Sequence, residues 1–160
     1  MTRYAEHTTV TVAKSRDEIE HTLVRFKANA VAWIRDDEKR IVQIHFRRTE
    51  RAYRFTVKLA NPADFKHDKR RYIYSNAPES IQAERAEQEN MRLFRSLANY
   101  VKAILDAVDS GILTFEEAMM PHMMLPSGQT VAETVTGQMP ALMEGKRLEL
   151  PVLALPGAAH

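Results

Sequence analysis

The sequence predicts an α+β fold, in which an antiparallel sheet of three or four strands is covered by helices and followed by a small helical subdomain. Apolar and polar residues alternate over 30–59, which is typical of antiparallel strands with one buried face. Apolar residues then recur at helical spacing over 79–109. Two Thr-x-x-Glu capping boxes, at Thr114 and Thr130, each predict the start of a short helix. The expected division of the chain is an α+β domain over 1–110, a helical subdomain packed on the long helix over 111–145, and a tail over 146–160.

Composition excludes several classes of protein. With 160 residues and 44% hydrophobic content, the chain can bury one sizeable core, alone or with an appended helical subdomain. It has no cysteine, which excludes disulfides, thiolate metal sites and cysteine nucleophiles. No apolar run reaches the roughly 18 residues of a transmembrane helix, and the first residues lack the apolar region of a signal peptide. We therefore expect a cytoplasmic protein.

Charge is unevenly distributed along the chain. The net charge is only +2, but residues 35–72 hold 12 Lys and Arg against 6 Asp and Glu, whereas residues 73–160 hold 6 against 11. Such segregation predicts either a binding surface for an anion or internal pairing between the two halves.

The first elements expected are a short strand over 8–12 and a helix that begins with a capping box. Ser15 is followed three residues later by Glu18, so each side chain can bond the backbone N–H of the other residue. The apolar stripe of this helix is Ile19, Leu23 and Phe26.

A three-stranded meander is expected after this helix. Its first strand covers 30–35 and is joined by a polar turn over 36–39 to a hairpin. If Arg35 pairs with Arg40, the apolar residues of the first strand extend the apolar face of the hairpin. A turn at 48–51 sets the register of the hairpin itself. The expected apolar pairs are Phe46 with Tyr53, Ile44 with Phe55, Val42 with Val57, Trp33 with Val42, and Val31 with Ile44.

The same register places a cationic set on the opposite face of the sheet. Its members are His45, Arg47, Arg54 and Lys58. A long loop follows, between Asn61-Pro62 and Ala77-Pro78, and a loop of this length is usually functional or disordered. Its cations and aromatic residues include Lys66, Lys69, Arg70, Arg71, Tyr72 and Tyr74. Tyr72 and Tyr74 can instead form a short edge strand.

A long helix is expected over 79–109, acidic in its first half and apolar along one stripe in its second. The acids of its first half include Glu84, Glu87 and Glu89. The two capping boxes then predict a short helix that ends at Pro121 and a helix over 131–143. Between these helices we expect a strand over 122–125 and a turn over 126–129.

The sequence contains no recognisable catalytic motif. Its five glycines form no nucleotide-binding loop, and its six histidines lack the spacing of metal ligands. Asp106 and Asp109 lie one helical turn apart, but solvated acids are ordinary at the end of a helix. We predict a protein that is not an enzyme and that uses no metal or cofactor.

Two explanations of the cations stay open. In the first, the hairpin face and the loop bind nucleic acid, either DNA or RNA. Arg47, Arg54 and Lys58 then neutralise phosphates, Tyr72 and Tyr74 stack on bases, and the cations of the loop add phosphate contacts. In the second, the acids of the long helix neutralise the same cations within the fold or across a dimer, or the cations simply keep an exposed strand soluble.

A methionine cluster suggests an alternative function. Met119, Met120, Met123 and Met124 surround Pro121. Methionine adapts its shape, so such a cluster can bind a partner, although it more often forms a plastic core. The alternative is a protein-interaction module, for example an inhibitor of a host defence protein, that uses this Met-rich surface or the acidic helical surface.

The order of helix, three antiparallel strands and helix is also that of the double-stranded-RNA-binding domain. The second helix of that domain opens with lysines that contact phosphates, whereas the helix here opens Ser80-Ile81-Gln82-Ala83-Glu84. An acidic start repels RNA, so the likeness is one of topology alone.

Two segments resemble a family of small phage- and prophage-encoded proteins that are usually described as hypothetical. The segments are SRDEIEHTL over 15–23 and YVKAILDAVDSGILTFEEAMMPHMMLPSGQTVAE over 100–133. Members of the family resemble this chain in an SRxEIE helix after a strand, and in a KAxLxAVxxGIxTFEE block followed by LPxGxTV. The resemblance covers most of 8–135. It implies a phage or mobile-element origin, hence a location in the host-cell cytoplasm, and it supplies no functional residues.

Overall fold

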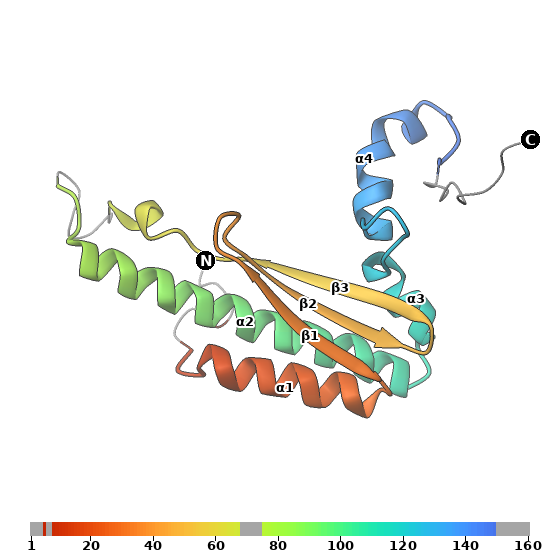
Figure 1. The fold of residues 1–160 in the computed structure, drawn as a ribbon, viewed down its shortest axis with the longest axis horizontal. Coiled ribbons are helices and arrows are strands. Elements are labelled where there is room, and N and C mark those ends of the chain that lie inside the picture. The colour runs from red at the N-terminus through yellow and green to blue at the C-terminus, as the bar shows by residue number, and fades with distance from the viewer. Residues whose placement is uncertain (1–4, 6–7, 68–74, 150–160) are drawn as a thin grey trace, which may run out of the picture.

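The computed structural model describes Ala5 and residues 8–67 and 75–149, and it has the predicted α+β fold (Figure 1). The elements in chain order are α1 (Val12–Arg25), β1 (Ala30–Asp36), β2 (Ile41–Arg48), β3 (Arg51–Lys58), the 3₁₀ turn η1 (Pro62–Phe65), α2 (Glu79–Asp109), α3 (Phe115–Met119), the 3₁₀ turn η2 (Met120–His122) and α4 (Val131–Met143).

One face of the sheet is covered by two helices. The strand order is β1-β2-β3, and α1 and α2 lie side by side below the sheet in Figure 1. The core between the layers consists of Ile19, Leu23, Ile44, Phe46, Tyr53, Phe55, Ala98, Val101 and Leu105. α3 adds Phe115, Ala118 and Met119 to the same core. α4 stands away from the sheet beyond α3 (Figure 1).

α2 has the predicted bounds, and because it is longer than the strands, its two halves have different surroundings. At 31 residues it is roughly 46 Å long, which exceeds the length of the strands. Its first half therefore packs against η1 and the chain around it. The Gln82 amide nitrogen donates to the Ala77 carbonyl at 2.6 Å, and the Asn90 side-chain oxygen accepts from the Ala60 N–H at 2.8 Å. These bonds satisfy backbone groups that would otherwise be unpaired in the loop.

The register of the hairpin is confirmed. Phe46 pairs with Tyr53, Ile44 with Phe55 and Val42 with Val57. The turn consists of Thr49 and Glu50, and Thr49 has a φ of +56°. The rings of Phe46 and Tyr53 stack with centroids 5.0 Å apart, so the cross-strand pair also contributes to the core.

The predicted register between β1 and β2 is wrong by two residues. The turn takes the four residues 37–40, and the Asp36 carboxylate accepts a hydrogen bond from the Lys39 N–H at 2.9 Å. An even shift keeps the same side chains on the core face, so alternation alone does not distinguish the two registers. The observed pairs are Trp33 with Ile44 and Val31 with Phe46.

The predicted start of the first helix is also wrong. The N-cap is Thr11, whose hydroxyl accepts from the Lys14 N–H at 3.2 Å. Ser15 lies inside α1, fully buried, and its hydroxyl has no hydrogen-bond partner among the described residues. The strand expected over 8–12 is not present. Val12 is instead the first residue of α1, and its side chain packs at the edge of the core.

Both predicted capping boxes are confirmed, at Thr114 with Glu117 and at Thr130 with Glu133. The strand expected over 122–125 is not present. Two isolated bridges replace it, and in one of them the Met124 N–H donates to the Ala52 carbonyl at 2.8 Å. The described sheet has three strands, and the alternative edge strand at Tyr72 and Tyr74 lies outside the described residues.

Candidate nucleic-acid interface

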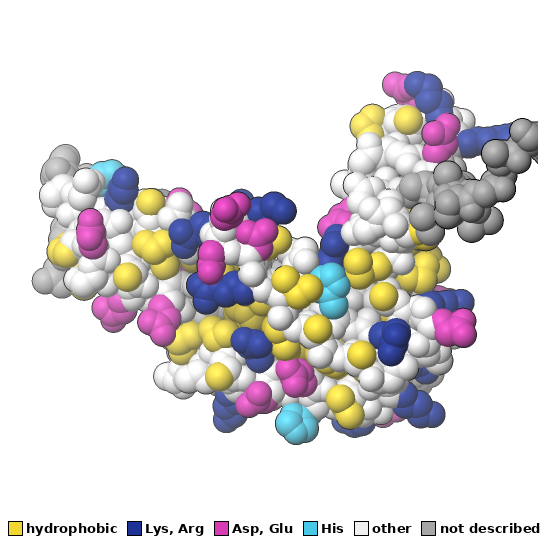
Figure 2. Space-filling model, viewed as in Figure 1, with side chains coloured by type: hydrophobic (Ala, Val, Ile, Leu, Met, Phe, Trp, Pro, Cys, Tyr) yellow, Lys and Arg dark blue, Asp and Glu magenta, His cyan; other side chains and the backbone are white. Residues whose placement is uncertain are grey.

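The face of the sheet that points away from α1 and α2 is the predicted cationic face, and none of its residues is buried. We call it the outer face. Its residues are Ala30, Ala32, Ile34 and Asp36 in β1, Ile41, Gln43, His45 and Arg47 in β2, and Ala52, Arg54, Thr56 and Lys58 in β3. Figure 2 shows positive and negative side chains interspersed over the visible surface, with no large patch of one sign. The outer face itself combines alanines, polar residues and Asp36 with its cations, which are therefore described one by one.

Arg54 is not available for a phosphate. Its guanidinium donates to the Gly128 carbonyl at 3.0 Å and forms an ion pair with Glu133, and only 12% of its side chain is exposed. Burial by itself raises the pKa of the Glu133 carboxyl, but the Thr130 backbone N–H and Arg54 outweigh that effect, so the pKa lies below its ordinary value. Arg54 thus connects β3 to the start of α4 and is already neutralised.

The imidazole of His45 is harder to protonate than that of an exposed histidine. Burial lowers the pKa of its imidazole, and the positive charge of Arg54 lowers it further. The ring lies 3.1 Å from the side-chain oxygen of Gln43 and forms a hydrogen bond with it. His45 and Gln43 together offer polar groups at the middle of the outer face.

Arg47 and Lys58 are exposed, and neither forms an ion pair with a described residue. The Arg47 Nε donates to the Asn29 side-chain oxygen at 3.3 Å, which leaves its terminal nitrogens available. The two cations lie six pairing positions apart along the hairpin, about 20 Å at the rise of a β-strand. They mark the two ends of the outer face.

The predicted loop site is only partly described. Lys66 follows η1 and is exposed, and its carbonyl accepts from the Ala77 N–H at 2.7 Å, which ties the two ends of the loop together. Lys69, Arg70, Arg71, Tyr72 and Tyr74 lie outside the described residues.

The acidic residues of α2 were predicted to pair with the cations of the hairpin. Among the described residues they do not form these pairs. Glu84 and Glu87 are exposed on the helix that covers the opposite face of the sheet, and Glu89 pairs with Arg92 at 2.6 Å. The acid that holds Arg54 is Glu133 of α4 instead.

A second set of cations, at the turn of the hairpin, was missed by the sequence prediction. The guanidinium of Arg48 lies 4.1 Å from the ring centroid of Phe115, and Glu116 lies 3.7 Å from Arg48 and 3.9 Å from Arg51. The alternation of side chains along β2 could have identified Arg48. It follows Phe46 by two positions, so its side chain lies on the core face. These arginines attach α3 to the end of the sheet.

The methionine cluster is divided between core and surface. Met119 is fully buried, Met123 packs against the core, Met124 is half-buried, and Met120 is 51% exposed. The exposed methionines nearest to it in sequence are on α4, where Met139 is 44% and Met143 82% exposed.

Among the described residues, no group of three or more histidine and carboxylate side chains is placed to hold a metal ion. Nor does any helix in this part of the chain have the length and apolar character needed to cross a membrane.

The chain matches no family model, no curated protein and no solved structure. The resemblance to phage-encoded proteins therefore stays a prediction, and the function has to be argued from the molecule itself.

The Arg54–Glu133 pair predicts a specific pH dependence of stability. Because the pKa of Glu133 is lower in the folded chain, its ionised form stabilises the fold above the ordinary pKa of 4.5, and this contribution is lost as the pH falls through the folded pKa. The difference in unfolding free energy between wild type and Glu133→Gln, from urea titrations, should be largest above about pH 5 and shrink toward pH 3.

Glu117→Gln is the matched control. Glu117 occupies the same position in the capping box of α3, and the Thr114 backbone N–H likewise lowers its pKa, but no arginine is among the causes. We expect a smaller pH-dependent difference for this variant. Equal differences for the two variants would show that Arg54 contributes nothing to the effect.

Proposed function

We propose that the protein binds nucleic acid, DNA or RNA, across the outer face of the sheet. The observation that carries the proposal is the exposure of Arg47 and Lys58 at the two ends of a face that α1 and α2 leave open, with no acidic partner among the described residues. Phosphate contacts need cations that are not already neutralised within the fold. Gln43, His45 and Thr56 lie between the two cations and supply hydrogen-bonding groups.

The proposed site differs from the predicted one at a single described residue. Arg54 positions α4 rather than contacting phosphate, while Lys66, exposed after η1, keeps the phosphate role predicted for it. Tyr72 and Tyr74 keep the stacking role and Lys69, Arg70 and Arg71 the phosphate role proposed for them from the sequence. In this proposal the chain is a non-enzymatic accessory protein of a phage or mobile element that acts in the host cytoplasm.

The test is a fluorescence-polarisation titration with single- and double-stranded oligonucleotides over a salt series. About four phosphate contacts give a log–log slope near −3. The double variant Arg47→Gln/Lys58→Gln should weaken binding at least about tenfold and reduce the slope by about 2.

The control for net charge is Lys14→Gln/Lys102→Gln, which removes two cations from the groove between α1 and α2 on the opposite side. It should bind nearly as well as wild type. An equal loss in both double variants would mean diffuse attraction without an interface, and absence of binding at low salt would end the proposal.

A second candidate function, protein recognition, is favoured by α4. Eight of its 13 residues are apolar, yet only Thr134 is buried. A helix that exposes apolar residues such as Met139 and Met143 can enter the apolar groove of a partner protein.

This candidate is tested by comparing wild type with Met139→Glu/Met143→Glu in pull-downs from nuclease-treated host lysate. A protein retained by wild type and lost at least about tenfold in the variant supports recognition through α4. The control Glu144→Gln changes an exposed residue next to the helix. Protein recognition through α4 is contradicted if wild type and both variants retain the same proteins, or if none of the three retains any protein.

A further inference from the structure

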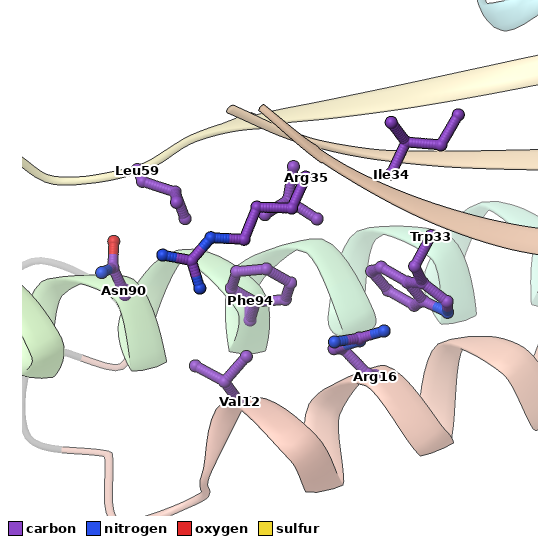
Figure 3. A pocket seen from close by; sticks show the side chains of 9 residues that line it. Val12, Arg16, Trp33, Ile34, Arg35, Leu59, Asn90 and Phe94 are labelled. Atoms are coloured by element: carbon purple, nitrogen blue, oxygen red, sulfur yellow. The ribbon is translucent and has the colours of Figure 1, made fainter. Parts of the chain in front are cut away.

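A cavity of about 340 Å³ opens between the β1 edge of the sheet and the two helices (Figure 3). Its volume falls within the range of small-molecule sites. The residues that line it are Val12 and Arg16 of α1, Trp33, Ile34 and Arg35 of β1, Val42 of β2, Leu59 after β3, and Asn90 and Phe94 of α2. It lies largely on the helical side of the sheet, and Ile34 is its one lining residue that belongs to the outer face.

The inner surface of the cavity is apolar and partly planar. The rings of Trp33 and Phe94 stack at 29° with centroids 6.2 Å apart, and Val12, Val42 and Leu59 complete the lining. In Figure 3 Trp33 points toward the helices while Ile34 points to the other side of β1. Such a surface favours a flat, apolar ligand body.

The polar groups of the cavity are hydrogen-bond donors. The guanidinium of Arg16 lies 4.3 Å from the Trp33 ring centroid, and no carboxylate of the described chain lies within ion-pair distance of it. Arg35 donates from Nε to Asp37 at 2.6 Å, which leaves its terminal nitrogens available, and its guanidinium lies between Asn90 and Phe94 in the view of Figure 3. None of the lining residues is acidic, and the two described carboxylates that contact them are Asp37, on the Nε of Arg35, and Glu20, which accepts from the indole N–H of Trp33.

Asn90 completes this donor set. Its side-chain oxygen is occupied by the Ala60 N–H, so its amide nitrogen is the group left for a ligand. Two guanidinium groups and an amide N–H₂ around an aromatic surface recognise an anion, because each of them can only donate.

We propose that this cavity binds a small organic anion, with a planar apolar body against Trp33 and Phe94 and a carboxylate- or sulfonate-like group between Arg16 and Arg35. The site is separate from the proposed nucleic-acid interface and does not depend on it. Trp33 is the only tryptophan in the chain, so its fluorescence reports on this cavity alone.

The probe for the test is 8-anilinonaphthalene-1-sulfonate, titrated into the full chain while energy transfer from Trp33 is followed. Its neutral counterpart, N-phenyl-1-naphthylamine, has the same aromatic body without the anion. We expect one probe molecule per chain, quenching of Trp33, and binding of the sulfonate at least about tenfold tighter than that of the neutral compound, as one charge-assisted hydrogen bond gives.

Variants assign the anion contacts. Arg16→Gln and Arg35→Gln should each weaken binding of the sulfonate about tenfold, whereas Lys14→Gln removes a charge from the same helix and should leave the affinity unchanged. Arg47→Gln/Lys58→Gln should also bind the probe like wild type, which separates this site from the nucleic-acid interface. Circular dichroism verifies that each variant is folded.

Three results would overturn the proposal. They are equal affinity for the charged and neutral compounds, wild-type affinity in both arginine variants, and probe binding without quenching of Trp33.

Discussion

The structure depends on the burial of one face of a three-stranded sheet under two helices. Ile44 at the centre of the sheet, Leu23 of α1 and Leu105 of α2 are each at most 1% exposed. Burial of such side chains contributes roughly 1.5–3 kcal/mol each, so the pairing of the layers outweighs any single surface contact. Because α1 and α2 lie on the same side, the outer face of the sheet is left open except at Arg54, which the start of α4 covers.

The remaining elements attach to the edges of this two-layer unit through arginines. Arg54 holds the start of α4 at the β3 edge, and Arg48 holds α3 at the end of the hairpin. At the β1 edge, Arg16 and Arg35 face a cavity instead of a neighbouring element. The arginines and lysines of the chain therefore have three different roles: some attach neighbouring elements to the sheet, some are exposed, and two line a cavity. A count of charges does not separate these roles.

Local patterns predicted much of the fold. The hairpin register and the bounds of α2 followed from alternation and helical spacing, and the caps at Thr114 and Thr130 from their Thr-x-x-Glu motifs. The β1–β2 register was wrong because an even shift preserves alternation. The pairing of Arg54 was not predicted because its partner Glu133 is 79 residues away, a contact that no local pattern contains. The cavity was missed for the same reason, since residues of α1, β1, β2, α2 and the chain after β3 build it.

The most direct test of this account is the reactivity of thiols placed on the two faces of β3, which is unambiguous because the chain has no cysteine of its own. Thr56 is exposed on the outer face, and Val57 is 7% exposed beneath it. Under native conditions Thr56→Cys should react with a maleimide at nearly the rate of the unfolded chain. Val57→Cys should react more than about 100-fold more slowly, because its modification requires the core to open. Equal protection at both positions would contradict the account, since the outer face would then be covered. Equal reactivity at both positions would also contradict it, because α1 and α2 would then not cover the inner face of the sheet.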